Sequence, residues 1–398
     1  MSDYKAIISA INSILNDITL ERIRNFTAEN PIEIAKQLGA SRKSVKLMEL
    51  LEVNHPSLGR KFVRFGYSTG QINYFLLAKW LMLRARVVGA EMAYQSVLSL
   101  ESSDVVHGYT VTLIRGLEFY GAIDFYNGIK LVDYQNLPST ILENLAVKIN
   151  PERERLYPPY TYLIQPLSNN FFDADYPFVD DHLKLYSESE LLIVNYLSLF
   201  TDAFAPTVDR RWYVLNDEVP MSGICDYQSI CYLEMEPPKI HFNLNSVAKE
   251  EIESTFIKYI EIPTDLKLPI DISISRIVKA MNTWNNVNKA IDLGVALEAA
   301  FIHEESKLKK SQQVRNTGAH LVKVFEGYKV KSLLYTIYGI RSDAVHRGKV
   351  LNEYKVDNVG FKPVSILLDL GVNVLKHCII GIIKRNGVVP KVTNNPDI

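Results

Sequence analysis

The residue types best suited to chemistry lie near the C-terminal end of the sequence, in the segment YTIYGIRSDAVHRG at residues 335–348. Arg341 and His346 stand there in an R-x4-H relation, which places them about 140° apart on an ideal helix. They would converge only if the last helical turn deforms, and Gly348 just beyond them is a natural C-cap. An arginine beside a histidine offers a fixed cation and a titratable imidazole. These two groups suit metal-free RNA cleavage, because the imidazole moves a proton at a ribose or leaving-group oxygen while the guanidinium stabilises phosphate charge.

A helical segment must position this pair. From about residue 272 to residue 385, apolar residues recur at helical spacing. We expect five helices there, over residues 272–286, 287–305, 311–326, 330–347 and 363–385. The Arg–His pair lies at the end of the fourth helix, and the run ALEAAF at residues 296–301 lies in the second.

Taken together, these features resemble the HEPN family, and in particular the ApeA-like HEPN domains of prokaryotic defence proteins. Members commonly show an ALEAL-type helix followed by a Y-x-x-R-S-x-x-V-H-G ending. The sequence departs from this ending at Arg347, where members often have Gly, and has Gly348 one place later. The resemblance covers about residues 272–385, under a third of the chain. The ending is matched at Tyr338, Arg341, Ser342, Val345 and His346.

The resemblance implies a dimerising helical bundle in which the R-x4-H motifs of two protomers face each other. The composite site would cleave RNA without a metal and leave a 2′,3′-cyclic phosphate. The protein would be an endoribonuclease that acts in antiviral defence (abortive infection) or as a toxin. His346 would be the general acid and base, and Arg341 the phosphate clamp. Ser342 would take the polar position after the arginine, a role that Asp343 could supply instead, and Glu298 would orient Arg341. The expected RNA-binding residues are Tyr338, Arg347 and Lys349.

The same residues also allow a structural interpretation. Arg341 and His346 could form an exposed helix end, where His346 would favour the C-terminal dipole. Glu298 could make an ion pair within the bundle, and Tyr335 and Tyr338 could be core or interface residues. HEPN domains without activity also serve as binding modules. The alternative function is therefore a non-catalytic interaction or regulatory protein.

An N-terminal pattern would suit DNA binding in that alternative. The run IAKQLGASRKSV at residues 34–45 resembles a helix-turn-helix, with Gly39 at the turn and Ser41 as the cap of the second helix. The second helix of such motifs enters the major groove of DNA. An ordinary helical hairpin with a solvated basic face is the competing interpretation. The basic residues of the second helix are Arg42, Lys43 and Lys46.

Two further patterns are explained more simply. The run GYSTG at residues 66–70 matches a hydrolase nucleophile elbow, with Ser68 as the nucleophile, but that fold needs several preceding strands. Because residues 1–60 are predicted to be helical, we favour a loop or a helix N-terminus capped by Ser68 or Thr69. An acidic cluster lacks the calcium-loop pattern, which favours a solvated loop and no metal or cofactor. Its members are Asp173, Asp175, Asp180, Asp181 and His182.

The chain as a whole predicts an α+β protein of several domains, because 398 residues exceed one typical core. Residues 1–100 predict a helical N-terminal region. Residues 101–270 predict a mixed, strand-rich region that would sense an unknown trigger or restrain the nuclease. Residues 271–398 predict the all-α, HEPN-like bundle, and the run LKLPIDIS at residues 266–273 marks the boundary.

The net charge of −1 conceals two opposed parts. Residues 270–398 hold 19 Lys and Arg against 11 Asp and Glu, a net charge of +8. Residues 1–269 hold 25 against 34, a net charge of −9. A basic C-terminal domain suits an RNA partner, doubly so across a homodimer.

The cysteines and the apolar runs indicate a cytoplasmic protein. Three cysteines cannot form a disulfide framework, and their spacing is not a zinc pattern. No apolar run reaches about 18 residues without a charge, since Asp369 and Lys376 interrupt the longest, so we expect no membrane span. The cysteines are Cys225, Cys231 and Cys378.

Overall fold

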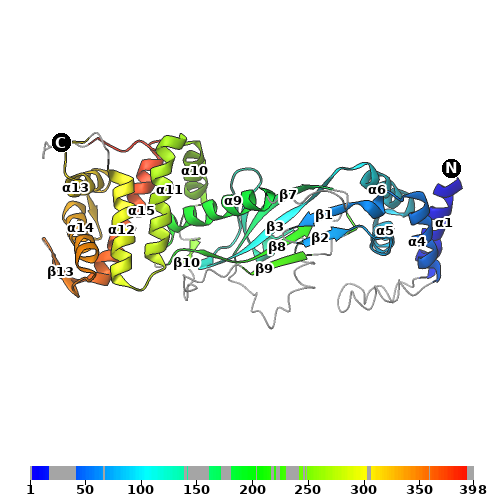
Figure 1. Ribbon diagram of the computed structural model, residues 1–398, viewed down its shortest axis with the longest axis horizontal. Coiled ribbons are helices and arrows are strands. Elements are labelled where there is room, and N and C mark those ends of the chain that lie inside the picture. The colour runs from blue at the N-terminus through cyan, green and yellow to red at the C-terminus, as the bar shows by residue number, and fades with distance from the viewer. Residues whose placement is uncertain are drawn as a thin grey trace.

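The computed structural model describes residues 2–17, 42–65, 68–138, 141, 161–171, 181–202, 204–216, 219–220, 225–229, 242–244, 247, 249–302, 306–357 and 359–391. These residues form a mixed α/β protein of elongated shape (Figure 1). N-terminal helices lie at one end, a sheet lies in the middle, and the C-terminal helices form a bundle at the other end. The prediction of a mixed protein with a helical C-terminal region is confirmed.

The N-terminal helices share a hydrophobic cluster with one end of the sheet, including Val106 and Leu215. Apolar residues at helical spacing form α1 (Ser2–Asp17), in which Ile7, Ile11 and Ile14 are buried. The strand-like run KFVRF contains β1 (Phe62–Phe65), which pairs as an antiparallel hairpin with β2 (Ser68–Gln71). The other elements here are α4 (Arg42–Asn54), η1 (Leu58–Arg60), α5 (Tyr74–Val88) and α6 (Ala90–Ser102).

The middle of the molecule is an antiparallel sheet, whose described strands run in the order β5–β6–β7–β3–β8–β9. The central strand β3 comes from the predicted β-branched and aromatic run, and it pairs with β7 and β8. Gly108 permits the close approach of β8, because a Cβ there would stand 2.4 Å from the carbonyl oxygen of Val214. The strands are β3 (Val105–Arg115), β5 (Ala122–Asp124), β6 (Lys130–Asp133), β7 (Thr161–Asn170), β8 (Thr207–Leu215) and β9 (Cys225–Ser229).

Each face of this sheet contributes to a different hydrophobic cluster, since neighbouring strand residues point to opposite sides. Ile114 belongs to the cluster that contains Ile193 of α9 (Asp181–Leu197). Val111 and Trp212 belong to a second cluster on the opposite face. Short elements complete the middle region: β4 (Leu117–Glu118), η2 (Tyr134–Asn136), η3 (Ser198–Phe200) and β10 (Phe242–Asn243).

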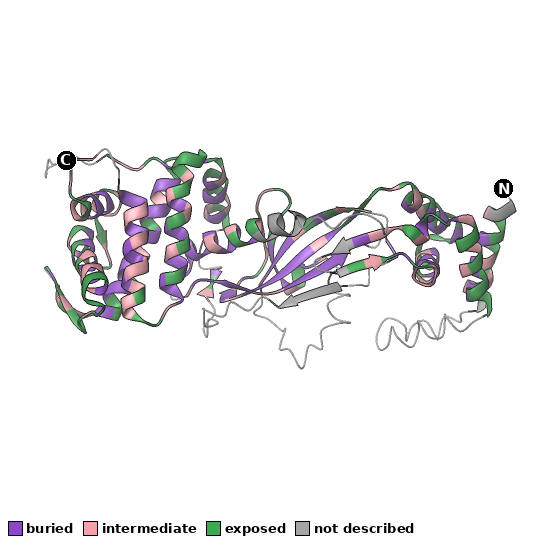
Figure 2. Cartoon of the chain, in the orientation of Figure 1, coloured by how far each residue is buried: buried purple, intermediate pink, exposed green. Residues whose placement is uncertain are grey.

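The C-terminal helices form a bundle whose inward sides are buried and whose outward sides are exposed (Figure 2). Two short hairpins, β11–β12 and β13–β14, flank α14. The helices are α10 (Lys249–Glu261), α11 (Thr264–Met281), α12 (Asn286–Phe301), α13 (Lys310–Leu321), α14 (Val330–Arg347) and α15 (Val364–Ile383). The hairpin strands are β11 (Val324–Phe325), β12 (Tyr328–Lys329), β13 (Glu353–Val356) and β14 (Gly360–Pro363).

The start of the bundle differs from the prediction. Helix α11 begins at Thr264, directly after Pro263, and runs through Pro269. The boundary predicted between residues 270 and 271 therefore falls inside a helix. Pro269 removes one i→i−4 hydrogen bond, which disfavours a continuous helix. However, the helix buries Ile270 and Ile274 against the bundle. This packing outweighs the tendency of proline to end the helix.

The bundle and the sheet are joined by one continuous hydrophobic cluster. At the junction, the ring of Tyr196 from α9 stacks on Tyr259 of α10 with centroids 5.5 Å apart, and it meets Phe256 edge-on at 4.9 Å. The backbone N–H of Ala205 donates to Asn282 Oδ1 at 3.1 Å. These contacts make the bundle and the sheet one packed unit.

Helix α15 is the one helix of the described residues that is long and apolar enough to cross a membrane. Of its most apolar window, 67% is buried inside the molecule. Asp369 and Lys376 interrupt the run, and Lys376 donates a hydrogen bond to the carbonyl of Thr201 within the junction. A helix covered to this extent by its own chain is typical of the core of a soluble protein.

Candidate active site

Helix α14 carries the R-x4-H motif, and it ends in the predicted way. Gly348 is the C-cap, with a left-handed φ of 64°, and its N–H donates to the Ala344 carbonyl at 3.1 Å. The helix stays regular through Arg347, so the deformation that would bring Arg341 and His346 together does not occur. The two side chains of one chain therefore leave the helix about 140° apart.

Arg341 is held at a defined position beside α12. Its Nη2 lies 3.0 Å from Glu298 Oε1, and the guanidinium carbon lies 5.6 Å from the ring centre of Tyr338. The Tyr338 hydroxyl donates to the same Glu298 oxygen at 2.8 Å. The structure thus brings Glu298 to Arg341, as expected for an orienting carboxylate.

A glycine makes this position possible. A Cβ on Gly294 of α12 would stand 2.2 Å from Cγ of Arg341 and 3.1 Å from its Cβ and Cδ. The stem of the arginine therefore lies directly on the α12 backbone. The sequence offered only a weak signal for this contact, a glycine inside a predicted helix, which usually has a packing reason.

The electrostatics of this cluster keep Tyr338 protonated. Burial, followed by the hydrogen bond to Glu298 and its negative charge, raises the pKa of Tyr338 to about 12. The phenol is therefore a hydrogen-bond donor at neutral pH. A further cation, Lys310 of α13, lies 3.8 Å from the other oxygen of Glu298 and is largely exposed.

His346 is exposed and makes no hydrogen bond or ion pair with any described residue. Ser342 is half-buried and lies on the side of the helix between Arg341 and His346, about 40° from the histidine. The imidazole is therefore free to meet a ligand or another chain.

Asp343 and Arg347 lie on a different side of α14. The Tyr354 hydroxyl of hairpin β13–β14 donates to Asp343 Oδ2 at 2.9 Å, and Arg347 Nη1 lies 3.4 Å from Asp343 Oδ1. Asp343 therefore faces the hairpin and not Arg341, and its supporting role stays a prediction. Lys349 is exposed just beyond the helix.

The tyrosines of α14 differ from each other. Tyr338 is partly buried, whereas Tyr335 is 57% exposed and so is not a core residue. The guanidinium carbon of Arg315, from α13, lies 5.6 Å from the ring centre of Tyr335. Sequence reasoning missed Arg315, because nothing local indicates that this residue of α13 reaches across to α14.

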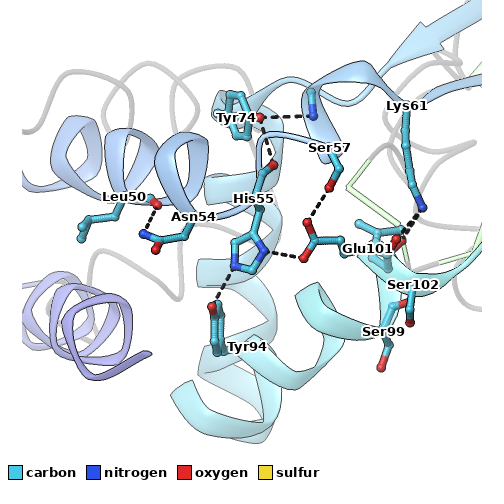
Figure 3. A network of polar contacts seen from close by, with 12 residues as sticks. Leu50, Asn54, His55, Ser57, Lys61, Tyr74, Tyr94, Ser99, Glu101 and Ser102 are labelled. Carbon is cyan, nitrogen blue, oxygen red and sulfur yellow. Dashed lines mark hydrogen bonds and ion pairs between the residues drawn. The ribbon is translucent and has the colours of Figure 1, made fainter. Parts of the chain in front are cut away.

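A second polar network lies at the other end of the molecule, around α4, α5 and α6 (Figure 3). The His55 ring is buried, with Nδ1 2.7 Å from Glu101 Oε2 and Nε2 2.7 Å from the Tyr94 hydroxyl. Ser57 donates to the other oxygen of Glu101. A Ser–His–acid triad needs the hydroxyl on the imidazole. Because this serine bonds the carboxylate instead, the network ties the helices together and does not form a hydrolase site.

The ionisation of Glu101 agrees with this structural role. Burial by itself would raise the pKa of Glu101, but hydrogen bonds from Ser57 and His55, together with the charges of His55 and Lys61, bring it below the ordinary value. The carboxylate therefore stays charged at neutral pH and accepts both hydrogen bonds.

The other sequence patterns do not form sites among the described residues. Ser68 lies in strand β2 opposite Phe65, not at a strand-to-helix turn, so the nucleophile elbow is wrong. The cap prediction is also wrong, because Asn73 caps α5 by accepting from Leu76 N at 2.8 Å. Residues 34–41 of the helix-turn-helix pattern and residues 173–180 of the acidic cluster lie outside the described residues. The described segments contain no cluster of possible metal ligands.

No known protein family, curated protein or solved structure matches the chain. The assignment of this site therefore depends on the R-x4-H motif and on the geometry around α14.

Proposed function

We propose that the protein is a HEPN-type, metal-independent endoribonuclease that acts in prokaryotic antiviral defence or as a toxin. The observation that carries the proposal is the arrangement at the end of α14. Arg341 is fixed by Glu298, Tyr338 and the close approach to Gly294, while the same helix presents an exposed imidazole at His346. Phosphodiester cleavage requires a cation held in position to stabilise phosphate charge and an accessible group that transfers protons.

The geometry favours a site completed by a second copy of the chain. Arg341 and His346 leave the regular helix about 140° apart, so one protomer cannot direct both groups at one phosphate. Two copies that pair at the C-terminal end of α14, around Arg341 and His346, would bring two arginines and two histidines together across a twofold axis and leave Tyr335 open. Such a dimer would also double the basic charge around the RNA.

The chemistry then follows from the two imidazoles. One imidazole removes the proton of a ribose 2′-hydroxyl, whose oxygen attacks the adjacent phosphorus. The bond from phosphorus to the 5′-oxygen breaks, and the second imidazole protonates that oxygen. The products are a 2′,3′-cyclic phosphate and a free 5′-hydroxyl. Arg341 stabilises the negative charge that builds on the phosphate oxygens.

The test is incubation of the full chain with total RNA and tRNA, with and without EDTA, followed by mapping of the cut ends. We expect cyclic-phosphate ends from the wild type, unchanged by EDTA, and none from His346→Ala or Arg341→Ala. His320→Ala is the matched control, since His320 is also an exposed histidine in the last turn of a bundle helix. Cleavage that persists in His346→Ala would refute the proposal and leave the non-catalytic interaction module as the better account.

A further inference from the structure

The outward side of α14 carries an unusual row of side chains. Lys331, Tyr335, Tyr338, Ser342 and His346 follow one another at spacings of four, three, four and four residues. On a regular helix these five positions fall within an arc of roughly 80° and extend over about 22 Å. We call this row the α14 stripe. It ends at the histidine of the proposed active site.

We propose that the α14 stripe binds single-stranded RNA, with Tyr335 stacking on a base and Arg315 contacting the phosphate beside it. The inference rests on the proposed function and extends it to the path of the substrate. It commits to single-stranded RNA because an exposed aromatic ring flanked by cations matches the way proteins hold unpaired nucleotides.

The ring of Tyr335 is available for stacking. It is 57% exposed, although it lies in the middle of a helix in which Ile337 and Ile340 are fully buried. The guanidinium of Arg315 covers it from the α13 side, with 5.6 Å between the guanidinium carbon and the ring centre. An arginine and an aromatic ring in this arrangement offer both a cation and a stacking surface.

Arg315 differs from the other arginines of the site in its partners. Arg341 pairs with Glu298, and Arg347 pairs with Asp343. Arg315 has no acidic partner among the described residues, and its buried Nε donates no hydrogen bond there. A guanidinium without an acidic partner among the described residues, beside an exposed tyrosine, is a place for an anion, and the phosphate of a stacked nucleotide supplies it.

The stripe also fixes a distance along the RNA. Tyr335 and His346 are eleven residues apart, or about 17 Å along the helix axis. At the 3.4 Å rise of stacked nucleotides this corresponds to about five nucleotides, and to fewer in an extended strand. The base held by Tyr335 is therefore several nucleotides from the phosphate that is cleaved, and a dinucleotide cannot reach both.

The experiment measures binding of a 12-nucleotide single-stranded RNA to the full-length His346→Ala protein by fluorescence anisotropy. Adding Tyr335→Ala should weaken binding by roughly 5- to 150-fold, the range for loss of one base–aromatic stack, while Tyr335→Phe should stay within about twofold. Arg315→Gln should weaken binding and reduce the salt slope by about one. Tyr120→Ala is the matched control, because Tyr120 of the middle region is 54% exposed and should have no effect.

Equal RNA affinity with and without Tyr335→Ala would overturn the inference. If the mass measured by light scattering also falls in the Tyr335→Ala variant, the stripe is a protein interface instead. Failure of the endoribonuclease proposal is distinguishable. Suppose that the wild type cleaves no RNA, and that Tyr335→Ala still weakens RNA binding. The α14 stripe would then be supported as an RNA-binding surface, and the catalytic assignment would be refuted.

Discussion

Gly294→Ala provides the sharpest test of how Arg341 is positioned. The new Cβ would lie 2.2 Å from Cγ of Arg341, whereas ordinary contacts are 3.4–4 Å. The arginine would have to shift by more than about 1 Å, and because Cγ lies close to its own backbone, the shift requires a new rotamer. The guanidinium would then leave both Glu298 and the ring of Tyr338.

The effect on stability should be small. Alanine in place of glycine in a helix interior stabilises by about 1 kcal/mol. Opposing this, the steric conflict costs roughly 1–3 kcal/mol, and the partly exposed pair of Arg341 with Glu298 contributes only about 0.5 kcal/mol. The opposing effects leave a net loss of at most about 3 kcal/mol, which a domain of ordinary stability survives. Activity should fall much further, by about 100-fold or more, because a 1 Å misplacement of a catalytic group has that effect.

The assay compares RNA cleavage and thermal unfolding of Gly294→Ala with those of Gly339→Ala. Gly339 lies in α14, and a Cβ there meets nothing within 4 Å, so its variant should be more stable by about 1 kcal/mol and fully active. A folded Gly294→Ala protein that cleaves RNA at the wild-type rate would refute the reasoning, since the position of Arg341 would then not matter.

A buried lysine and a buried ion pair give further predictions. Burial lowers the pKa of Lys376 from 10.5 to about 8, so between these pH values the unfolded chain binds the additional proton and stability rises with pH. Urea denaturation should show this rise in the wild type and a smaller rise in Lys376→Met. Arg211 of β8 and Glu190 of α9 form a buried ion pair, with Nε 2.8 Å from Oε2. Arg211→Met should destabilise by roughly 3–5 kcal/mol in chemical denaturation, because it leaves Glu190 buried without its partner. The double variant with Glu190→Leu should recover much of this loss, and no recovery would contradict the explanation.

Short hairpins show why some elements escaped prediction. Residues 311–326 were expected to form one helix, but α13 ends at Leu321 and the chain continues into β11–β12. The turn of this hairpin is Glu326–Gly327, both with positive φ, as a two-residue type I′ turn requires. Strands of two residues are too short to show a period, so the pairing depends on the turn and on the helices that flank it.

The sequence by itself determined the local features of the site. Apolar residues at helical spacing predicted the helix over residues 330–347, and the structure has α14 at Val330–Arg347 with Gly348 as its cap. The R-x4-H spacing likewise fixed the angle between Arg341 and His346, because a regular helix converts residue number into direction.

Only the tertiary structure decided which residues meet. Glu298 and Gly294 reach Arg341 because α12 packs on α14, and Arg315 reaches Tyr335 because α13 does. Helix α11 continues through Pro269 because it packs on the bundle, although the local sequence predicted a domain boundary there. Periodicity shows which side of a helix is apolar, but the partner on that side depends on how distant segments fold together.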